Sequence, residues 1–383
     1  MSVTAPLGFG AAGVAAGLKQ SGQPDVAVVL NDGPSRSAAA VFTTNRVQAA
    51  PVTWTRQVVT GGRVRAVVLN SGGANACTGP AGFQDTHATA EHLAAAVDDS
   101  PGEIAVCSTG LIGQRLPMDK LLPGVDAAVA EASRAGGLAA ADAIRTTDTV
   151  VKIAFRRVDG YSIGGMAKGA GMLAPGLATM LCVLTTDADL EPAQLDSALR
   201  AATAMTFDRL DTDGCMSTND TVLLMASGAA GVKPDKAEFT LALTEVCADL
   251  ARQLQLDAEG ANKMITIEVV GAASEADAVT AGRAVARNNL LKCAIGGEDP
   301  NWGRVLSAVG TTDAVFQPDR LNVAINGIWV CRHGAPGDER AKVDLKPKDV
   351  TITVDLSAGP HSAIILTTDL TTAYVYENSA YST

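Results

Sequence analysis

The segment Ser108-Thr109-Gly110 places two hydroxyl side chains and a glycine directly after the apolar run Ile104–Cys107. Backbone N–H groups at such a strand end can receive an anion or the oxyanion that forms during acyl transfer. An ordinary strand-to-helix turn is the competing interpretation of this segment.

A lone lysine, Lys168, stands among the glycines of residues 164–171, ahead of the turn Pro175-Gly176 and an apolar run that contains Thr179. Glycines around a lysine are typical of phosphate-binding loops. The GxxxxGK[ST] motif is absent, however, because neither serine nor threonine follows Lys168, so the spacing disfavours a nucleotide site. Thr179 is the first hydroxyl after the turn, and on its own a threonine in a strand is an ordinary β-former.

Three further polar clusters interrupt apolar segments, at residues 211–220, 257–263 and 297–304. The first gathers acidic and amide side chains ahead of a predicted strand, without the glycine and glutamate spacing of an EF-hand loop. The last places Trp302 and Arg304 beside two acidic residues. A solvated turn is the competing interpretation for each cluster.

Taken together and in this order, these segments closely resemble the ornithine acetyltransferase (glutamate N-acetyltransferase) family of arginine biosynthesis. The resemblance extends from about Phe42-Thr43-Thr44-Asn45 to the last residue. The motifs that carry it are Ser108–Gly110, Lys168–Met172 followed by Ala178–Leu181, Ser217–Asp220, Asp299–Arg304 and the terminal Asn378–Thr383.

The chain departs from the family pattern at two places. Cys215-Met216 follow Asp213-Gly214 where family members often carry Asp-Gly-Asp-Thr, and Gly296-Gly297-Glu298 precedes the Asp-Pro-Asn-Trp-Gly-Arg motif. Neither departure touches Lys168 or Thr179, so they concern fine specificity more than the type of reaction.

The resemblance implies a single precursor that cleaves itself between Ala178 and Thr179. Residues 1–178 would form an α chain and residues 179–383 a β chain that begins with the nucleophile Thr179; these are chains, not independent folding domains. An N-terminal α-amine has an ordinary pKa of about 7.7–8.0, so it can accept the proton of the Thr179 hydroxyl. The acetyl group would then pass from N2-acetyl-L-ornithine through an acetyl-Thr179 ester to L-glutamate, a ping-pong transfer that needs no cofactor.

The resemblance also assigns roles to individual residues. Thr109 and Gly110 match the oxyanion-hole pair of the family. Substrate binding falls to Thr179 itself, Lys168, Glu259, Asn378, the terminal Thr383 and one of the two neighbours Thr146 and Thr147, between which the resemblance does not choose. Charge supports this set, because a cation such as Lys168 can hold the α-carboxylate that both substrates share, and Glu259 suits the ornithine ammonium.

Two other functions remain as alternatives. One is a self-processing amidase or aminopeptidase of the same architecture, in which water replaces glutamate as the acceptor. The other is a non-enzymatic amino-acid binding protein that is never cleaved. Within the favoured function, acetyl-CoA is a second candidate donor, which would make the enzyme bifunctional, and the family suggests an α2β2 assembly.

The elements that must position these residues mix strands and helices without strict alternation. We therefore predict an α+β fold, a layered α/β sandwich of mixed sheets covered by helices, with a smaller C-terminal lobe. Short apolar runs predict strands over Val26–Leu30, Val64–Leu69, Ile104–Ser108, Met180–Thr185, Thr221–Ala226, Met264–Val270 and Val350–Leu356. Apolar residues at helical spacing predict helices over Thr86–Val97, Pro192–Ala204, Lys236–Leu256 and Ser274–Ala286.

Composition narrows the class of partner and the compartment. The 30 basic and 41 acidic residues give a net charge of −11, which disfavours a nucleic-acid or anionic-membrane surface. No basic residue precedes Lys19 and no apolar stretch is long enough to span a membrane, so we expect neither a secretory signal nor a membrane anchor. The seven cysteines form no CxxC pair and the four histidines show no metal-ligand spacing, which favours buried thiols, a cytoplasmic location and no metal site.

Overall fold

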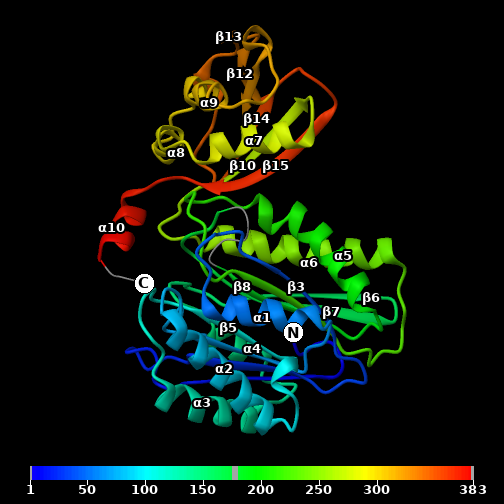
Figure 1. Ribbon diagram of the computed structural model, residues 1–383. Coiled ribbons are helices and arrows are strands. Elements are labelled where there is room, and N and C mark those ends of the chain that lie inside the picture. Colours follow the sequence, from blue (N-terminus) through cyan, green and yellow to red (C-terminus); the bar gives the residue numbers. More distant parts are fainter. Residues whose placement is uncertain (1, 175–179, 381–383) are drawn as a thin grey trace. The chain divides into compact units, whose positions relative to one another are not determined.

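The computed structural model describes residues 2–174 and 180–380, and these form two compact units (Figure 1). The larger unit comprises residues 2–174, 180–208 and 215–257, and the smaller unit comprises residues 209–214 and 258–380. Both contain mixed sheets with helices, so the predicted α+β class and the smaller C-terminal lobe are confirmed.

The larger unit contains two sheets. The first has the order β1 (Phe9–Val14), β2 (Val26–Asn31), β4 (Ala66–Ser71) and β5 (Ile104–Thr109). The second has the order β3 (Ser37–Phe42), β9 (Thr221–Ala226), β8 (Leu181–Thr186), β7 (Tyr161–Lys168) and β6 (Lys152–Val158). The pairs β4–β5 and β8–β9 are parallel and the other pairs are antiparallel.

The two sheets pack face to face because each presents apolar side chains to the other. Alternate residues such as Val29 and Leu69 of the first sheet share one core with Val183 and Leu223 of the second. The residues between them point outward and pack against α2 (Gly79–Ala96) and α3 (Met118–Glu131). Helices α5 (Pro192–Met205) and α6 (Lys236–Leu256) contact the second sheet, which gives helix, sheet, sheet and helix layers. Helix α1 (Ala50–Thr60) contacts the edge strands β3 and β5. Helix α4 (Gly137–Ala143) contacts the edge strands β1 and β6 at the opposite edges of the two sheets.

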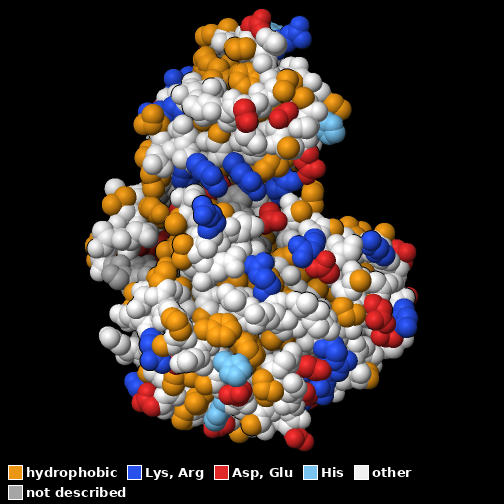
Figure 2. Space-filling view, in the orientation of Figure 1, with side chains coloured by type: hydrophobic (Ala, Val, Ile, Leu, Met, Phe, Trp, Pro, Cys, Tyr) orange, Lys and Arg blue, Asp and Glu red, His pale blue; other side chains and the backbone are white. Residues whose placement is uncertain are grey.

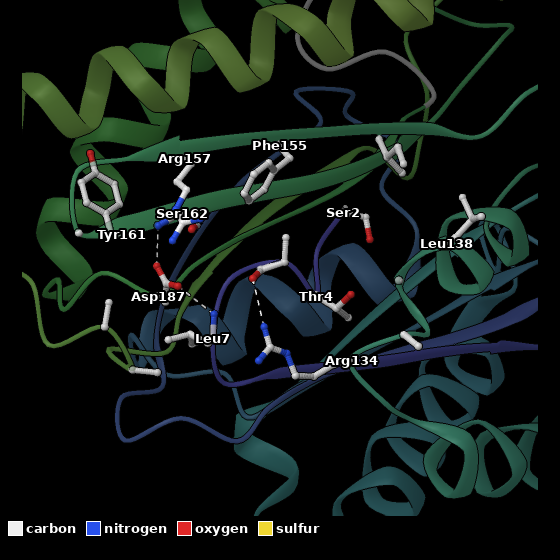
Figure 3. A pocket seen from close by; sticks show the side chains of 17 residues that line it. Ser2, Thr4, Leu7, Arg134, Leu138, Phe155, Arg157, Tyr161, Ser162 and Asp187 are labelled. Atoms are coloured by element: carbon white, nitrogen blue, oxygen red, sulfur yellow. Dashed lines mark hydrogen bonds between the residues drawn. The ribbon is translucent and has the colours of Figure 1, made fainter.

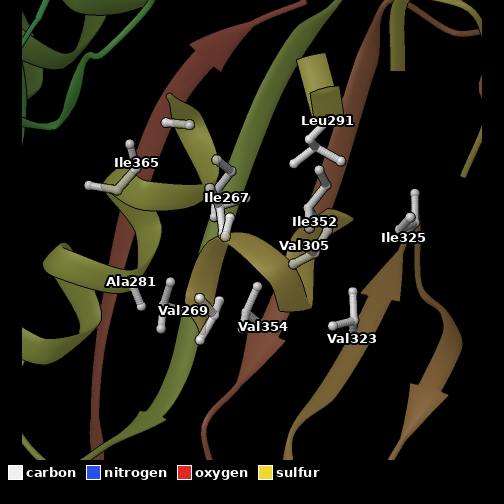
Figure 4. Close-up of a cluster of buried hydrophobic side chains, with 14 of the residues drawn as sticks. Ile267, Val269, Ala281, Leu291, Val305, Val323, Ile325, Ile352, Val354 and Ile365 are labelled. Carbon is white, nitrogen blue, oxygen red and sulfur yellow. The ribbon is translucent and has the colours of Figure 1, made fainter. Parts of the chain in front are cut away.

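The smaller unit is built on one six-stranded sheet. Its order is β13 (Ala335–Pro336), β12 (Ile328–Arg332), β11 (Asn322–Ile325), β14 (Asp349–Asp355), β10 (Met264–Ala272) and β15 (His361–Thr368). Helices α7 (Glu275–Ala286), α8 (Asn289–Gly296) and α9 (Trp302–Val309) share a core with the strands, in which Ile267 and Val354 meet Leu291 and Val305 (Figure 4). Helix α10 (Thr372–Ala380) follows the last strand.

All seven strands and all four helices predicted from the sequence are present, with bounds that shift by a few residues. The largest shift is at α2, which begins at Gly79 rather than Thr86. Strand β7 was not predicted, because Gly164 and Gly165 in its middle resemble a loop. These glycines serve close packing instead: a Cβ at Gly164 would lie 2.2 Å from the Ser2 carbonyl oxygen.

The strands on either side of the predicted cleavage site belong to one sheet. β7 ends at Lys168 and pairs with the first residue of β8, Leu181. The predicted cleavage residues Ala178 and Thr179 lie outside the described residues, so the division into α and β chains stays a prediction. If cleavage occurs there, strands from both products hold the second sheet together.

The composition led to expectations about surface charge, membrane spans and cysteine burial, which the structure tests in part. Figure 2 shows both acidic and basic side chains on the face that it displays. None of the described helices is long and apolar enough to cross a membrane. All seven cysteines are free, but Cys77, Cys215 and Cys293 are exposed, so the prediction of buried thiols is wrong for these three.

Candidate active site

The end of β5 brings Thr109 against Lys168, which ends β7 in the other sheet. Lys168 Nζ donates to Thr109 Oγ1 at 3.3 Å, and only 1% and 2% of the two residues, respectively, is exposed. Because Oγ1 acts as the acceptor in this bond, the Thr109 O–H remains able to donate to a developing oxyanion. The structure therefore brings two predicted site residues together from two different sheets.

Gly110 adopts a backbone conformation that favours glycine. Its φ is +127°, and a Cβ at this position would lie only 2.5 Å from the Gly73 nitrogen. The N–H groups of Gly72 and Gly73 both donate to the Thr109 carbonyl at 3.0 Å, which holds the two loops together. Gly110 thus has a structural requirement in addition to its predicted oxyanion role.

Asp148 connects the loop of the two candidate threonines to the residue after Lys168. Its Oδ1 accepts from the Gly169 N–H at 2.6 Å, and its Oδ2 accepts from the Thr146 N–H at 3.0 Å. Thr146 and Thr147 are half-buried in this loop, which follows α4. One carboxylate thus holds the loop of both threonines against the end of β7.

Asp148 belongs to a buried charge cluster, which we define as Asp148, Lys152, Lys168 and Asp257. Lys152 Nζ donates to Asp148 Oδ1 at 2.6 Å and to Asp257 Oδ2 at 2.5 Å. Burial alone would raise the pKa of Asp148, but the charges of Lys168 and Lys152 and the bonds from Lys152 and Gly169 lower it to about 2. The cluster therefore holds two carboxylates against two ammonium groups inside the protein.

The segment Ser217–Asp220 supports the ends of β5 and β8. Asn219 Nδ2 donates to the Ser108 carbonyl at 2.8 Å and to the Ala74 carbonyl at 2.6 Å. All four residues of the segment are at most 9% exposed, so the solvated-turn interpretation is wrong here. The motif resemblance includes Asn219 but predicts no role for it.

Asp220 holds the residue that follows the predicted nucleophile. Its Oδ1 accepts from the Met180 N–H at 2.9 Å. Burial raises the pKa of Asp220 well above its ordinary range, although the Met180 N–H, the Ser217 side chain and the Lys168 charge act in the opposite direction. This buried carboxyl therefore fixes the start of β8, next to position 179.

The remaining predicted residues lie in the smaller unit or outside the described part of the chain. Asn378 Nδ2 donates to Glu259 Oε2 at 3.0 Å, so the structure brings these two predicted substrate ligands together. Thr371 Oγ1 donates to the Gly260 carbonyl at 2.6 Å, which anchors the start of α10 beside Glu259. Ala178, Thr179 and Thr383 lie outside the described residues.

The Asp299–Arg304 motif has structural contacts in the smaller unit. Asp299 pairs with Arg340, and Arg304 donates to the Leu290 carbonyl. Trp302 begins α9 and packs against the core. Within residues 2–174 and 180–380, no three His, Cys, Asp or Glu side chains are placed to hold a metal ion.

A cavity of about 870 Å³ extends along β6 from Ile153 to Arg157 and past the turn into β7, and none of the predicted site residues lines it. Arg134 and Arg157 extend toward this space from different walls, beside Phe155 (Figure 3). Asp187 stands at its edge and accepts from the Ser162 N–H at 2.6 Å and from the Leu7 N–H at 2.9 Å. The cavity has a size that suits a small ligand, but it is separate from the contact between Thr109 and Lys168.

Comparison with known proteins places this chain in a family. The model described as the ArgJ family matches residues 10–383. The arginine biosynthesis bifunctional protein ArgJ of Thermobifida fusca is 76% identical over 383 residues, which cover 100% of both chains. The protein of the same name from Mycobacterium tuberculosis is 60% identical over 388 residues, which cover 99% of this chain and 96% of that protein. A solved ornithine acetyltransferase of Mycobacterium tuberculosis, complexed with ornithine, matches at 60% identity with a TM-score of 0.45 over 47% of this chain and 96% of that chain. The chain therefore belongs to the ArgJ family.

Proposed function

We propose that this chain is an acyltransferase of arginine biosynthesis that moves the acetyl group of N2-acetyl-L-ornithine to L-glutamate. The observation that carries the proposal is 76% identity over the whole chain to a protein named an arginine biosynthesis bifunctional protein. The buried contact between Lys168 and Thr109 supports it, because it places a cation for a substrate carboxylate beside a donor for an oxyanion.

The proposed nucleophile is Thr179, freed when the precursor cleaves itself after Ala178. Its Oγ1 attacks the acetyl carbonyl carbon of acetylornithine while its own α-amine takes the hydroxyl proton. The negative charge that develops on the carbonyl oxygen is stabilised by Thr109 and Gly110. When the C–N bond breaks, the proton passes to the departing ornithine amine and an acetyl-Thr179 ester remains.

Glutamate reverses these steps. Its α-amine attacks the ester carbonyl, a second oxyanion forms at the same donors, and collapse returns the proton to Thr179 Oγ1 and releases N-acetylglutamate. Both half-reactions use one site because the two substrates share an α-carboxylate, which we assign to Lys168 and the loop of Thr146 and Thr147. Glu259, Asn378 and Thr383 stay predicted substrate ligands, and we assign Glu259 to the ornithine ammonium.

Three finer points belong to the same proposal. The relatives are named bifunctional, which supports acetyl-CoA as a second acetyl donor to glutamate. The two products of cleavage stay associated through the pairing of β7 with β8, and we propose that they assemble as α2β2. The enzyme would act in the cytoplasm, where biosynthetic substrates of this kind are found.

The test is an assay of acetyl transfer to glutamate from acetylornithine and from acetyl-CoA, in parallel. We expect N-acetylglutamate from both donors and parallel double-reciprocal lines for acetylornithine at several glutamate concentrations, because the acetyl group rests on the enzyme between half-reactions. Acetate release without glutamate would instead identify an amidase, and intersecting lines would mean direct transfer in a ternary complex.

A further inference from the structure

The buried charge cluster takes four charged side chains out of water. Lys152 and Lys168 are 0% and 1% exposed, and the side chains of Asp148 and Asp257 are 0% and 7% exposed. Removing charges from water is expensive, and apolar residues of similar volume can often replace a buried ion pair without loss of stability. A cluster of this kind beside Thr109 therefore calls for a role in geometry.

Asp148 is the member of the cluster that contacts both parts of the predicted carboxylate site. Its two oxygens accept from Thr146 in one loop and from Gly169 at the end of β7. The positive charge of Lys168 lies close enough to act on the same carboxylate. These two segments are brought together from separate elements, since one follows α4 and the other ends a strand of the second sheet.

We propose that Asp148 is a positioning residue for acetyl transfer: it holds the Thr146–Thr147 loop and Lys168 in the one arrangement that receives the α-carboxylate of both substrates beside Thr109. Asp148 acts through Lys168 and the loop and does not itself touch the substrate. This inference rests on the proposed function. It adds that Asp148 shapes the site for the α-carboxylate that both substrates share.

Asp257 supplies a matched control. It accepts from Lys152 and from the Thr149 N–H at 3.0 Å, so it belongs to the same cluster and is similarly buried. Among the described residues, Asp257 makes no hydrogen bond with Thr146 or Gly169. Asp257→Asn therefore removes a charge from the cluster while the contacts that define the carboxylate site persist.

The experiment uses two acetyl donors that differ only in the carboxylate. N-acetyl-1,4-diaminobutane is acetylornithine without this group, and kcat/KM for the donor reports only the first half-reaction. We expect the wild-type enzyme to prefer acetylornithine roughly 10- to 100-fold, as for a charge-assisted bond. Asp148→Asn should remove most of this preference by lowering kcat/KM for acetylornithine. The kcat/KM for N-acetyl-1,4-diaminobutane should stay within about threefold of its wild-type value.

The controls separate positioning from folding. Asp257→Asn should keep the preference, even if it lowers the melting temperature. Because Asp148→Asn leaves Lys152 with one partner fewer, the double variant Asp148→Asn with Lys152→Met provides a second form without that uncompensated charge. An equal loss for both donors in Asp148→Asn and in the double variant would overturn the proposal, and so would an equal loss of preference in Asp257→Asn.

A binding arm distinguishes this inference from the proposed function. Calorimetry compares ornithine with 1,4-diaminobutane on the wild type and on Asp148→Asn. If the wild type transfers no acetyl group but prefers ornithine, and Asp148→Asn loses that preference, the function is wrong and the role of Asp148 stands. A wild-type protein that shows no preference between the two amines overturns the role of Asp148.

Discussion

The strand pair β6–β7 carries basic residues at both ends, in opposite settings. At one end Lys152 and Lys168 are buried and tied to Asp148. At the other end Arg157 is exposed and lines the cavity of about 870 Å³. Its neighbour Arg156 points to the opposite face of the sheet, because successive side chains of a strand alternate. There Arg156 pairs with Glu245 of α6.

The proposed site lies at the buried end, so the proposal makes cavity volume a poor guide to chemistry in this fold. The end with Arg157 offers an accessible cation. The end with Lys152 and Lys168 offers cations whose positions are fixed by carboxylates and neighbouring strands. Catalysis needs groups that are held in place before the substrate arrives, and a low-dielectric setting strengthens each of their interactions. The buried end meets both conditions.

The largest effect is expected at position 179, which follows the buried end of β7. Thr179→Ala removes both the nucleophile and the hydroxyl needed for self-cleavage. Denaturing gels should show one chain of 39.0 kDa, and acetyl transfer should be absent. Thr179→Ser keeps a hydroxyl and should still be cleaved, and a Thr179→Ala protein that is cleaved normally would refute the assignment.

The next effect is expected at Thr109, on the β5 side of the same contact. Thr109→Val keeps the shape but removes the hydroxyl, and we expect kcat to fall on the order of 10²-fold, as for the loss of one oxyanion donor. Thr109→Ser should retain most activity. Gly110 is a poorer target, because a Cβ there would lie 2.5 Å from the Gly73 nitrogen. Equal activity of the Val and Ser variants would show that the hydroxyl takes no part.

A smaller effect is expected at Asn219, which supports the end of β5. Asn219→Ala removes the donor that two buried carbonyl groups share, so the free energy of unfolding should fall by about 1–3 kcal/mol and kcat by roughly tenfold. Asn288→Ala is a matched control, because it removes the N-cap bond to Leu291 of α8 and costs about 1 kcal/mol. Urea unfolding and kcat are measured for both; a drop in kcat for Asn288→Ala as well would mean that stability alone explains the loss.

Much of this arrangement was accessible from the sequence. Periodicity gave α6 its exact bounds, and the motif resemblance singled out Thr109 and Lys168, which the structure brings into contact. The helix prediction succeeded because it depends on a local pattern, whereas the roles of Thr109 and Lys168 stay predictions. The glycine pair of β7 hid the strand, because Gly164 packs closely against Ser2 and Gly165 against Leu184 and Leu250, all distant in the sequence.

Asp148 and Asp220 were not recognised because their roles depend on tertiary contacts. Asp148 and Lys152 are four residues apart, but one lies in a loop and the other begins a strand, so no helical spacing signals the pair. Asp220 bonds to Met180, 40 positions away. A polar residue in a turn looks solvated in the sequence, and only the packing of two sheets shows that it is buried.

Acid should remove the stability that ionised Asp148 contributes at the buried end of the strand pair. The pKa of Asp148 is lowered from 3.8 to about 2, so its ionised form stabilises the fold above its ordinary pKa, and this contribution is lost as the pH falls through about 2. The contribution should be roughly 2 kcal/mol. Urea unfolding of the wild type and Asp148→Asn at several pH values should show a difference that shrinks below about pH 4; a constant difference would mean that Asp148 is not the titrating group.

The smallest effect is expected at Arg157, at the exposed end of the strand pair β6–β7. Arg157→Ala removes an exposed cation from the cavity wall, and exposed side chains without strong partners change stability by no more than about 0.5 kcal/mol. Because Lys168 lies at the far end of β7, kcat and KM for acetylornithine and glutamate should stay within about twofold of wild type. The matched substitution at the buried end, Lys168→Ala, should raise KM for both substrates by at least about tenfold, since both lose the partner of their α-carboxylate. Steady-state kinetics on the two alanine variants therefore measures the difference between the ends directly. If Arg157→Ala raised KM as much as Lys168→Ala, the cavity would take part in substrate binding and the contrast between the two ends would fail.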